Sequence, residues 1–369
     1  MENAKLTLYQ LFVLILLFET GSSIVITLGI DANQDAWMTI LLGLALGLIL
    51  FLVYYQLSSY YPNKILTQYT KNIAGPFLGS IIGYLYVIYF MYLAARVLRD
   101  FGELLLTFAY SETPLIIINA IMVLTIVYGV SKGIEVMART GELFFIFLYL
   151  LAIVGFFLIL FAGLIDINNL KPMFANGIEP IIKVTLKQTM YVPFGEVIVF
   201  SMILPYLNHF KKGRKIGLYA ISLSGINLAL TTVINVAVLG VDVNKRSPFP
   251  LLSTIQLIKV AEFLERLDVF FMLALIMGCF FKISIYFYAS VVGISDLLKV
   301  KEHKKLAFPL GIILILVSMM IATSYPEHIK EGLNFVPLYL HLPMQVILPL
   351  FLLVVSFFRN RKKGTKADK

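Results

Sequence analysis

The sequence predicts an all-α membrane protein with ten transmembrane helices, arranged as two inverted halves of five. Three observations favour this fold class. Hydrophobic residues make up 60% of the 369 residues and charged residues only 14%, whereas a soluble domain carries about 25% charged residues. The apolar residues fall into ten runs of membrane-spanning length, and the first and sixth runs are both interrupted by helix-breaking residues.

Each predicted span is an apolar run of about 17 residues or more, the length that crosses the hydrocarbon core of a bilayer. No segment between these runs is long enough to form a soluble catalytic domain. The first run is also too long for a cleavable signal peptide. The ten runs cover residues 7–30, 37–60, 77–109, 114–131, 141–163, 183–207, 215–240, 263–295, 305–323 and 335–358.

Lysine and arginine gather in alternate connections between the spans and in the C-terminal tail. The positive-inside rule therefore places both termini in the cytoplasm. The basic tail at 359–369 is interpreted as a solvated stop-transfer anchor, with a contact to lipid or to a partner as the alternative. The basic connections contain Lys64 and Lys71, Lys132 and Arg139, Lys211, Lys212, Arg214 and Lys215, and Lys299, Lys301, Lys304 and Lys305.

Two halves of five spans would form an inverted repeat, because an odd number of spans reverses the direction in which the second half enters the membrane. The first half covers about 7–163 and the second about 183–358. Many secondary transporters have such repeats and build their ligand site from broken helices at matching places in the halves. The whole chain, 1–369, is expected to be a single transmembrane domain.

The first break lies in helix 1, where Gly21, Ser22 and Ser23 follow Glu19 inside the apolar run. An interrupted helix leaves free N–H and C=O groups, which lipid cannot satisfy. Such groups are tolerated where they line a cavity or bind a ligand. The alternative interpretation is close packing of helices through small residues.

The matching break lies in helix 6, where Val192, Pro193, Phe194 and Gly195 precede Glu196. Proline lacks an N–H group and disfavours helix at the residue before it. Half-helix N-termini suit a carboxylate, while free carbonyl groups suit an ammonium or another cation. The paired breaks therefore predict a mid-membrane site for a zwitterion such as an amino acid.

Helix 3 contains two pairs of opposite charges with a spacing of four, Arg96 with Asp100 and Arg99 with Glu103. Each pair can meet on one face of a helix. The pairs are interpreted either as mutual neutralisation near the outer end of a long helix or as the charged lining of an outer vestibule.

Lys282 lies deep in the apolar run of helix 8, too far from the ends of the run for its ammonium to reach the interface. The ammonium either replaces a bound metal cation or forms a structural ion pair. Glu19 and Lys282 are therefore assigned a role in charge or ion coupling.

Four further residues are candidate ligand contacts because of their positions in the predicted helices: Tyr92, Phe194, Ser284 and Tyr288.

The sequence predicts no enzyme, no cofactor and no metal site. A lone Cys279 excludes an internal disulfide and a cysteine metal site. The four histidines lack the spacing of metal ligands. No Ser-His-Asp arrangement, phosphate loop, dinucleotide fingerprint or nucleic-acid module is present, so a nucleic-acid partner is not expected.

Short motifs in the connections add a family resemblance that covers essentially the whole chain. They are "DAW" at Asp35–Trp37, "YPN" at 61–63, "TP" at 113–114, "GIEVMARTGE" at 133–142, "FPLL" at 249–252 and "ERLD" at 265–268. Each motif is weak by itself. In their order and spacing they resemble the B subunit of the germinant receptors of spore-forming bacteria, a branch of the amino acid–polyamine–organocation transporter superfamily.

The resemblance implies a LeuT-like fold, a location in the spore inner membrane, and a complex with an A subunit and a lipoprotein C subunit. It also implies that this subunit recognises the germinant, often an amino acid, at positions that Gly21–Ser23 and Val192–Glu196 occupy here. Some proton-coupled relatives carry a lysine in helix 5 in place of sodium. Helix 5 here, at 142–161, has none, and Lys282 in helix 8 is the candidate for that role.

Three functions are compatible with these expectations. The first is a germinant-sensing receptor subunit that binds a small polar ligand and signals to partner subunits. The second is an autonomous proton-coupled amino acid transporter, which the same fold also serves. The third is a scaffold with a vestigial pocket. The motifs in the connections favour the first.

Overall fold

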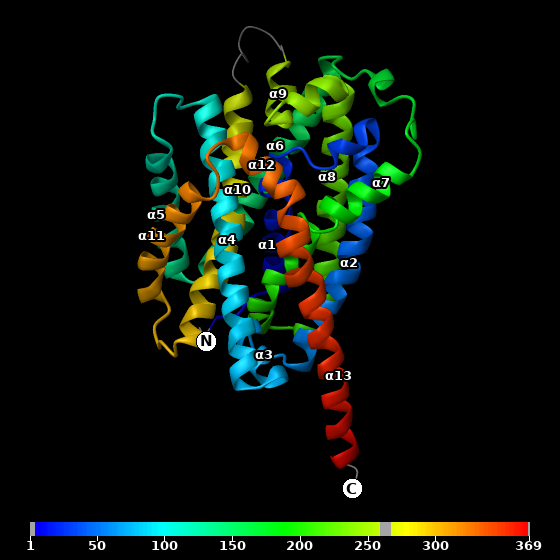
Figure 1. Cartoon of the computed structure of the whole chain (residues 1–369). Helices are drawn as coiled ribbons and strands as arrows, with labels where there is room; N and C mark the ends of the chain where they lie inside the picture. Colours follow the sequence, from blue (N-terminus) through cyan, green and yellow to red (C-terminus); the bar gives the residue numbers. More distant parts are fainter. Residues whose placement is uncertain (1–3, 259–266, 368–369) are drawn as a thin grey trace.

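The computed structural model describes residues 4–258 and 267–367, and the regular elements in these ranges are helices. One isolated bridge joins Leu6 to Leu207. Figure 1 shows the long helices running mostly along one direction, with the N- and C-termini at the same end of the molecule. The short helix α3 (Leu66–Ala74) lies at that end as well.

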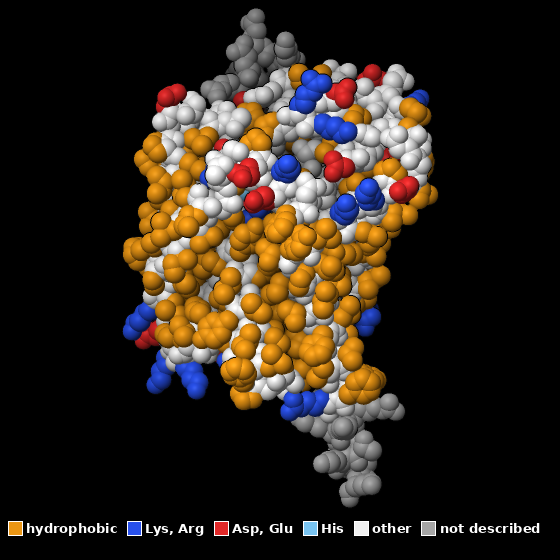
Figure 2. Space-filling model, in the orientation of Figure 1, with side chains coloured by type: hydrophobic (Ala, Val, Ile, Leu, Met, Phe, Trp, Pro, Cys, Tyr) orange, Lys and Arg blue, Asp and Glu red, His pale blue; other side chains and the backbone are white. Residues whose placement is uncertain are grey.

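Seven of the described helices are long and apolar enough to cross a membrane. Two further helices, α11 (Lys304–Met320) and α12 (Tyr325–Asn334), form a pair bent by 97°. If this pair is one span, the number of candidate spans rises to eight. Figure 2 shows a broad hydrophobic band across the molecule, with charged side chains above and below it. The chain is therefore an integral membrane protein. The seven comprise η2 (Ile30–Asp35) with α2 (Ala36–Tyr60), α4 (Pro76–Phe108), α5 (Leu115–Lys132), α6 (Ile134–Phe161), α8 (Phe210–Arg246), α10 (Leu267–Leu297), and η8 (Pro337–Ile347) with α13 (Leu348–Ala367).

The apolar runs at 7–30 and 183–207 contain shorter and less regular pieces than the other eight. Every residue from Tyr191 to Leu204 is nevertheless buried, so the second of these segments passes through the interior of the molecule. Residues 263–266 of the expected eighth span lie outside the described residues. The pieces are α1 (Leu8–Thr20) and η1 (Ser22–Ile24) in the first run, and α7 (Glu179–Val184), η4 (Thr185–Thr189), η5 (Phe194–Met202) and η6 (Leu204–Tyr206) in and before the second.

Short elements fix the ends of the long helices. The Thr70 hydroxyl of α3 donates a hydrogen bond to the carbonyl of Gly79 in α4 (3.0 Å). The Lys71 ammonium lies 3.0 Å from the Asp296 carboxylate near the end of α10. These contacts hold α3 across the ends of two spanning helices. The remaining short elements are η3 (Ile167–Leu170) and α9 (Pro250–Gln256).

Glycine allows α2 to approach the irregular segment closely. A Cβ atom added to Gly47 would lie 2.2 Å from the Cβ atom of Phe194, a separation that real side chains do not adopt. Phe194 itself is fully buried. The packing of α2 against η5 therefore requires the absence of a side chain at position 47.

We expect Gly47→Ala to lower the free energy of unfolding by about 1–3 kcal/mol, the usual cost of overpacking a core. Gly129→Ala is the matched control, because a Cβ atom at that position would lie at an ordinary distance of 3.7 Å from Phe280. Thermal unfolding of both purified variants in detergent measures the difference. Equal midpoints for the two variants would contradict the close packing of α2 against η5.

Candidate functional site

Regular α-helix ends at Thr20, in the middle of the first apolar run. The next residue, Gly21, has φ −15° and ψ −107°, and the turn η1 follows it. Gly21 lies directly on α10, because a Cβ atom there would be 2.9 Å from Cβ of Lys282 and 3.0 Å from the carbonyl oxygen of Gly278. The close approach brings Ser22 and Ser23 beside α10 at a point where the backbone of helix 1 is not α-helical.

The second irregular segment runs from the π-helical turn η4 to the 3-10 helix η5, with turns between them. Pro193, at the N-cap of η5, has no N–H group to donate to a preceding turn. Gly195 packs against the long helix η8–α13, because a Cβ atom there would lie 2.0 Å from Oε1 of Gln345. The Tyr54 hydroxyl of α2 donates to the Gly195 carbonyl over 3.3 Å.

A buried ion pair joins these two segments to α10. The Lys282 Nζ atom lies 2.6 Å from Oε2 of Glu196, and the exposed fractions of the two side chains are 1% and 6%. The same ammonium donates to the Ser23 hydroxyl over 3.3 Å and lies 5.2 Å from the centre of the Phe18 ring. Lys282 therefore contacts η1, η5 and α1 at once.

Glu19 adds a second carboxylate to this cluster. It is fully buried, and neither of its carboxylate oxygens has a hydrogen-bond partner among the described residues. An ionised carboxylate in an apolar interior is costly unless it is paired or hydrogen-bonded. Among the described residues Lys282 forms its ion pair with Glu196, so Glu19 is a buried carboxylate without an ion-pair partner there.

A small cavity of about 50 Å³ lies next to the ion pair. A cavity needs about 10–15 Å³ to hold one water molecule, so this one has room for a few water-sized groups. It lies between α4, α12, η8 and the two irregular segments. Its lining consists of Ser22, Ile26, Leu93, Arg96, Val97, Asp100, Val192, Glu196, His328, Ile329, Gly332, Leu333 and His341.

Polar contacts hold α12 over the cavity. Arg96 Nη2 donates to the carbonyl of His328 over 2.5 Å, and the His328 Nε2 atom lies 3.0 Å from Oδ1 of Asp100. The pairing of Arg96 with Asp100 that the spacing predicts is absent among the described ion pairs, because His328 takes Asp100 instead. The other predicted pair is present, with Arg99 Nη2 2.8 Å from Oε1 of Glu103.

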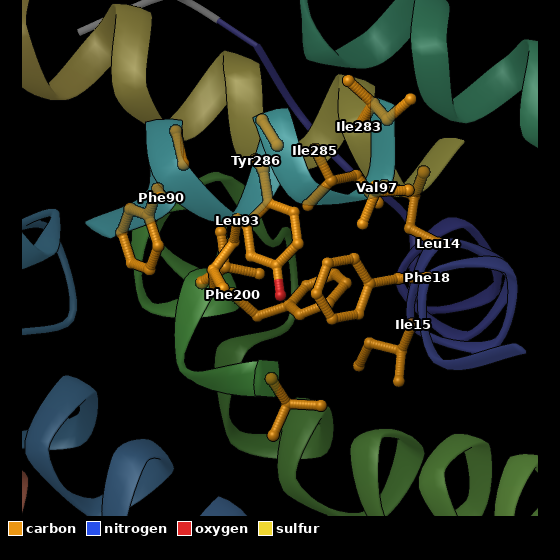
Figure 3. Packing of buried hydrophobic residues seen from close by; sticks show 14 of the residues in the cluster. Leu14, Ile15, Phe18, Phe90, Leu93, Val97, Phe200, Ile283, Ile285 and Tyr286 are labelled. Carbon is orange, nitrogen blue, oxygen red and sulfur yellow. The ribbon is translucent and has the colours of Figure 1, made fainter. Parts of the chain in front are cut away.

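Aromatic side chains pack together beside the ion pair. Figure 3 shows Phe18, Phe200 and Tyr286 facing one another, with Phe90 and Leu93 of α4 alongside. The ring of Phe18 lies 5.4 Å from that of Phe200 and 4.9 Å from that of Tyr286. This aromatic cluster reaches the ion pair through Phe18, whose ring centre lies 5.2 Å from the Lys282 ammonium.

A network around η8, which sequence reasoning missed, completes the site. The Tyr89 hydroxyl lies 2.6 Å from Nδ1 of His341 and accepts a hydrogen bond from Gln345 Nε2 over 2.8 Å. The hydroxyls of Tyr54 and Tyr86 donate to the carbonyls of Gln345 (2.6 Å) and Met344 (2.8 Å). The sequence signal that could have indicated this network is the pair of polar residues, His341 and Gln345, four apart in a mainly apolar run.

The residues expected from the sequence do not all meet at the cavity. Ser22, Val192 and Glu196 line it, and Tyr92 reaches it indirectly by accepting a hydrogen bond from Arg96 over 3.3 Å. Ser23 and Lys282 lie beside it at the ion pair.

The other candidates lie elsewhere. Phe194 packs against Gly47, and Tyr288 lies next to the rings of Tyr206 and His303, both at 6.4 Å. Ser284 is buried, and its hydroxyl has no hydrogen-bond partner among the described residues.

Removing one member of the buried pair should leave an uncompensated charge. We expect Glu196→Gln to lower the free energy of unfolding by about 3–5 kcal/mol. Glu103→Gln, which removes a more exposed partner at the outer part of α4, should cost less. Thermal unfolding in detergent compares them, and the double variant Glu196→Gln with Lys282→Met should recover part of the loss. No recovery in the double variant would argue against a direct ion pair.

Comparisons with known proteins agree on one family. A sequence model of the family described as "Spore germination protein" matches residues 5–326. The chain is 53% identical to spore germination protein KB of Bacillus subtilis (strain 168) over 373 residues, covering 100% of both chains. It is 24% identical to spore germination protein YndE of the same strain, covering 89% of each.

Two solved structures share the fold. MhsT in complex with L-phenylalanine aligns with a TM-score of 0.70 at 12% identity, covering 96% of this chain and 89% of the other. Mhp1, a nucleobase-cation-symport-1 family transporter in a closed conformation, aligns with a TM-score of 0.61 at 14% identity, covering 87% of this chain and 73% of the other. At such identities the likeness shows the fold alone, which is the LeuT fold.

Proposed function

The chain belongs to the spore germination protein family, and we propose that it is the germinant-sensing membrane subunit of a spore germination receptor. It binds a small polar ligand, an amino acid, at mid-membrane depth and signals to partner subunits. The observation that carries this proposal is the cavity lined by Ser22, Val192 and Glu196. Polar groups of both irregular segments meet there inside an otherwise apolar bundle.

The proposal includes an architecture of ten spans in two inverted halves, with helices 1 and 6 broken. Support comes from the irregular backbone at Gly21 in the first half and at Pro193 in the second. Ser22 and Val192, next to these residues, line the same cavity. Ligand binding at matching breaks is how inverted-repeat transporters use this arrangement.

We place both termini on the cytoplasmic side of the spore inner membrane, which faces the spore core. The end of the molecule that carries the termini shows mainly Lys and Arg below the hydrophobic band, whereas the other end shows charges of both signs (Figures 1 and 2). This asymmetry is what the positive-inside rule requires. The partners in the proposal are the receptor A subunit and the lipoprotein C subunit, inferred from the family.

The second candidate is an autonomous proton-coupled amino acid transporter. Glu19 favours it, since a buried carboxylate without a hydrogen-bond partner among the described residues is a group that can carry a proton. Both candidates use Glu19 and Lys282 for charge coupling.

Reconstitution of the purified protein into liposomes separates the candidates. Binding of a labelled amino acid without its accumulation under an imposed pH gradient supports the sensing subunit. Accumulation driven by the gradient supports the transporter. Absence of any binding would contradict both.

Bulky residues at the two breaks should impair the response to germinant. We expect spores that carry Gly21→Leu or Gly195→Leu to need a higher germinant concentration, because the added side chain would meet Lys282 or Gln345. Immunoblots should still detect the protein. Gly129→Leu, which lies away from the site, is the control for added bulk. An unchanged dose–response curve for either variant would argue against a role of that glycine in the site.

Ligand binding should be insensitive to exchange of sodium for potassium. The Lys282 ammonium occupies the point where oxygens of Ser23 and Glu196 meet. A second unit positive charge about 4 Å away would be repelled by about 4 kcal/mol at an effective dielectric constant near 20. Lys282→Met should weaken or abolish binding, because it leaves these oxygens unpaired. Strict dependence of binding on sodium in the unmodified protein would contradict this role and leave Lys282 as a structural residue.

A further inference from the structure

Arg96 is a buried guanidinium that forms no ion pair with the carboxylates of the described residues. Its exposed fraction is 9%. Its described hydrogen bonds go to neutral acceptors, the Tyr92 hydroxyl and the His328 carbonyl. Buried charges in proteins are ordinarily paired, so a guanidinium that borders a cavity without a carboxylate partner points to an anionic ligand.

The neighbouring acidic groups do not supply that partner. Asp100 lines the same cavity, but its Oδ1 atom is 3.0 Å from His328 Nε2. Glu103 is paired with Arg99. Glu196 lines the cavity and is paired with Lys282. Among the described residues, the cavity is therefore lined by a guanidinium without an ion pair, by Asp100, which is hydrogen-bonded to His328, and by Glu196, which is paired with Lys282.

The size of the cavity restricts what can lie between these groups. A cavity of about 50 Å³ suits only the smallest α-amino acids and is too small for an aromatic one in this conformation. Arginine has several N–H groups in one plane, and two of them can bind both oxygens of a carboxylate at once.

We propose that the cavity binds a small α-amino acid whose carboxylate is held by the Arg96 guanidinium, with the ammonium directed towards Ser22 and Glu196. This inference rests on the proposed function and adds the anchoring residue and the size class of the ligand. Arg96 also bonds to α12 through His328, so the same side chain connects the ligand to the element that covers the cavity.

The first test varies the ligand and leaves the protein unchanged. Full-length protein in nanodiscs is incubated separately with each of the common L-amino acids in radiolabelled form, and the bound ones are displaced with their carboxamides. We expect glycine, alanine or serine to bind, and their amides to compete about 10- to 100-fold more weakly, since hydrogen bonds to charged groups contribute about 1.5–3 kcal/mol.

The second test varies Arg96. We expect Arg96→Gln to lose the preference for the acid over the amide, and Arg96→Lys to retain part of it. Arg99→Gln is the matched control, because Arg99 lies on the same helix but is paired with Glu103 and does not line the cavity. It should keep the full preference. Size-exclusion profiles check that each variant folds. The first test, with the amides, uses the unmodified protein and so does not depend on the folding of any variant.

Distinct outcomes overturn distinct claims. Amides that bind the unmodified protein as well as the acids would overturn the role of Arg96 while leaving the proposed function intact. If Arg96→Gln weakens the binding of acids and of amides by the same factor, Arg96 holds α12 in place and does not bind the carboxylate. Binding of large amino acids alone would overturn the size class. No binding by any amino acid would overturn both this inference and the proposed function.

Discussion

The ion pair between Lys282 and Glu196 is the contact on which the rest of the site depends. Lys282 projects from the continuous helix α10, whereas Glu196 belongs to η5 and Ser23, which accepts from the same ammonium, belongs to η1. Leaving one buried charge without its partner costs several kcal/mol. Neither irregular segment can therefore move away from α10 unless the ammonium moves with it or finds another acceptor. Glu19, a buried carboxylate without a hydrogen-bond partner among the described residues, is an alternative acceptor by its chemistry.

The same constraint applies to the backbone, since carbonyl groups outside regular helix need donors in a membrane. Tyrosines supply them here. The Tyr54 hydroxyl bonds to the carbonyls of both Gly195 and Gln345, and Tyr86 bonds to that of Met344. Tyrosine suits this role because its ring packs in the apolar core while its hydroxyl donates. Tyr54 thereby ties η5 and η8 to α2, and Tyr86 ties η8 to α4.

Local sequence patterns could predict contacts that lie within one helix, but not those in which a distant segment competes. The spacing of four predicted the pair of Arg99 and Glu103 correctly, while Asp100 is taken by His328, 228 positions away. The network of Tyr89, His341 and Gln345 was missed for the same reason. On α10 the positions of the polar residues predicted that Ser284 and Tyr288 face the ligand site. Residues two apart in a helix point to different faces, and it is Tyr286 that packs against Phe18.

The contacts of α12 at the cavity and the aromatic contacts beside the ion pair differ in how readily they can be replaced. On the side of α12 the contacts are hydrogen bonds from Arg96 and His328, and each such bond contributes a modest net amount that water or a ligand can replace. Beside the ion pair lie fully buried rings, including Phe18 and Phe200, which do not line the cavity. Separating them would expose apolar surface worth about 1.5–3 kcal/mol per side chain. The hydrogen bonds of α12 can therefore be exchanged for bonds to a ligand or to water, whereas the contacts among the buried rings have no such replacement.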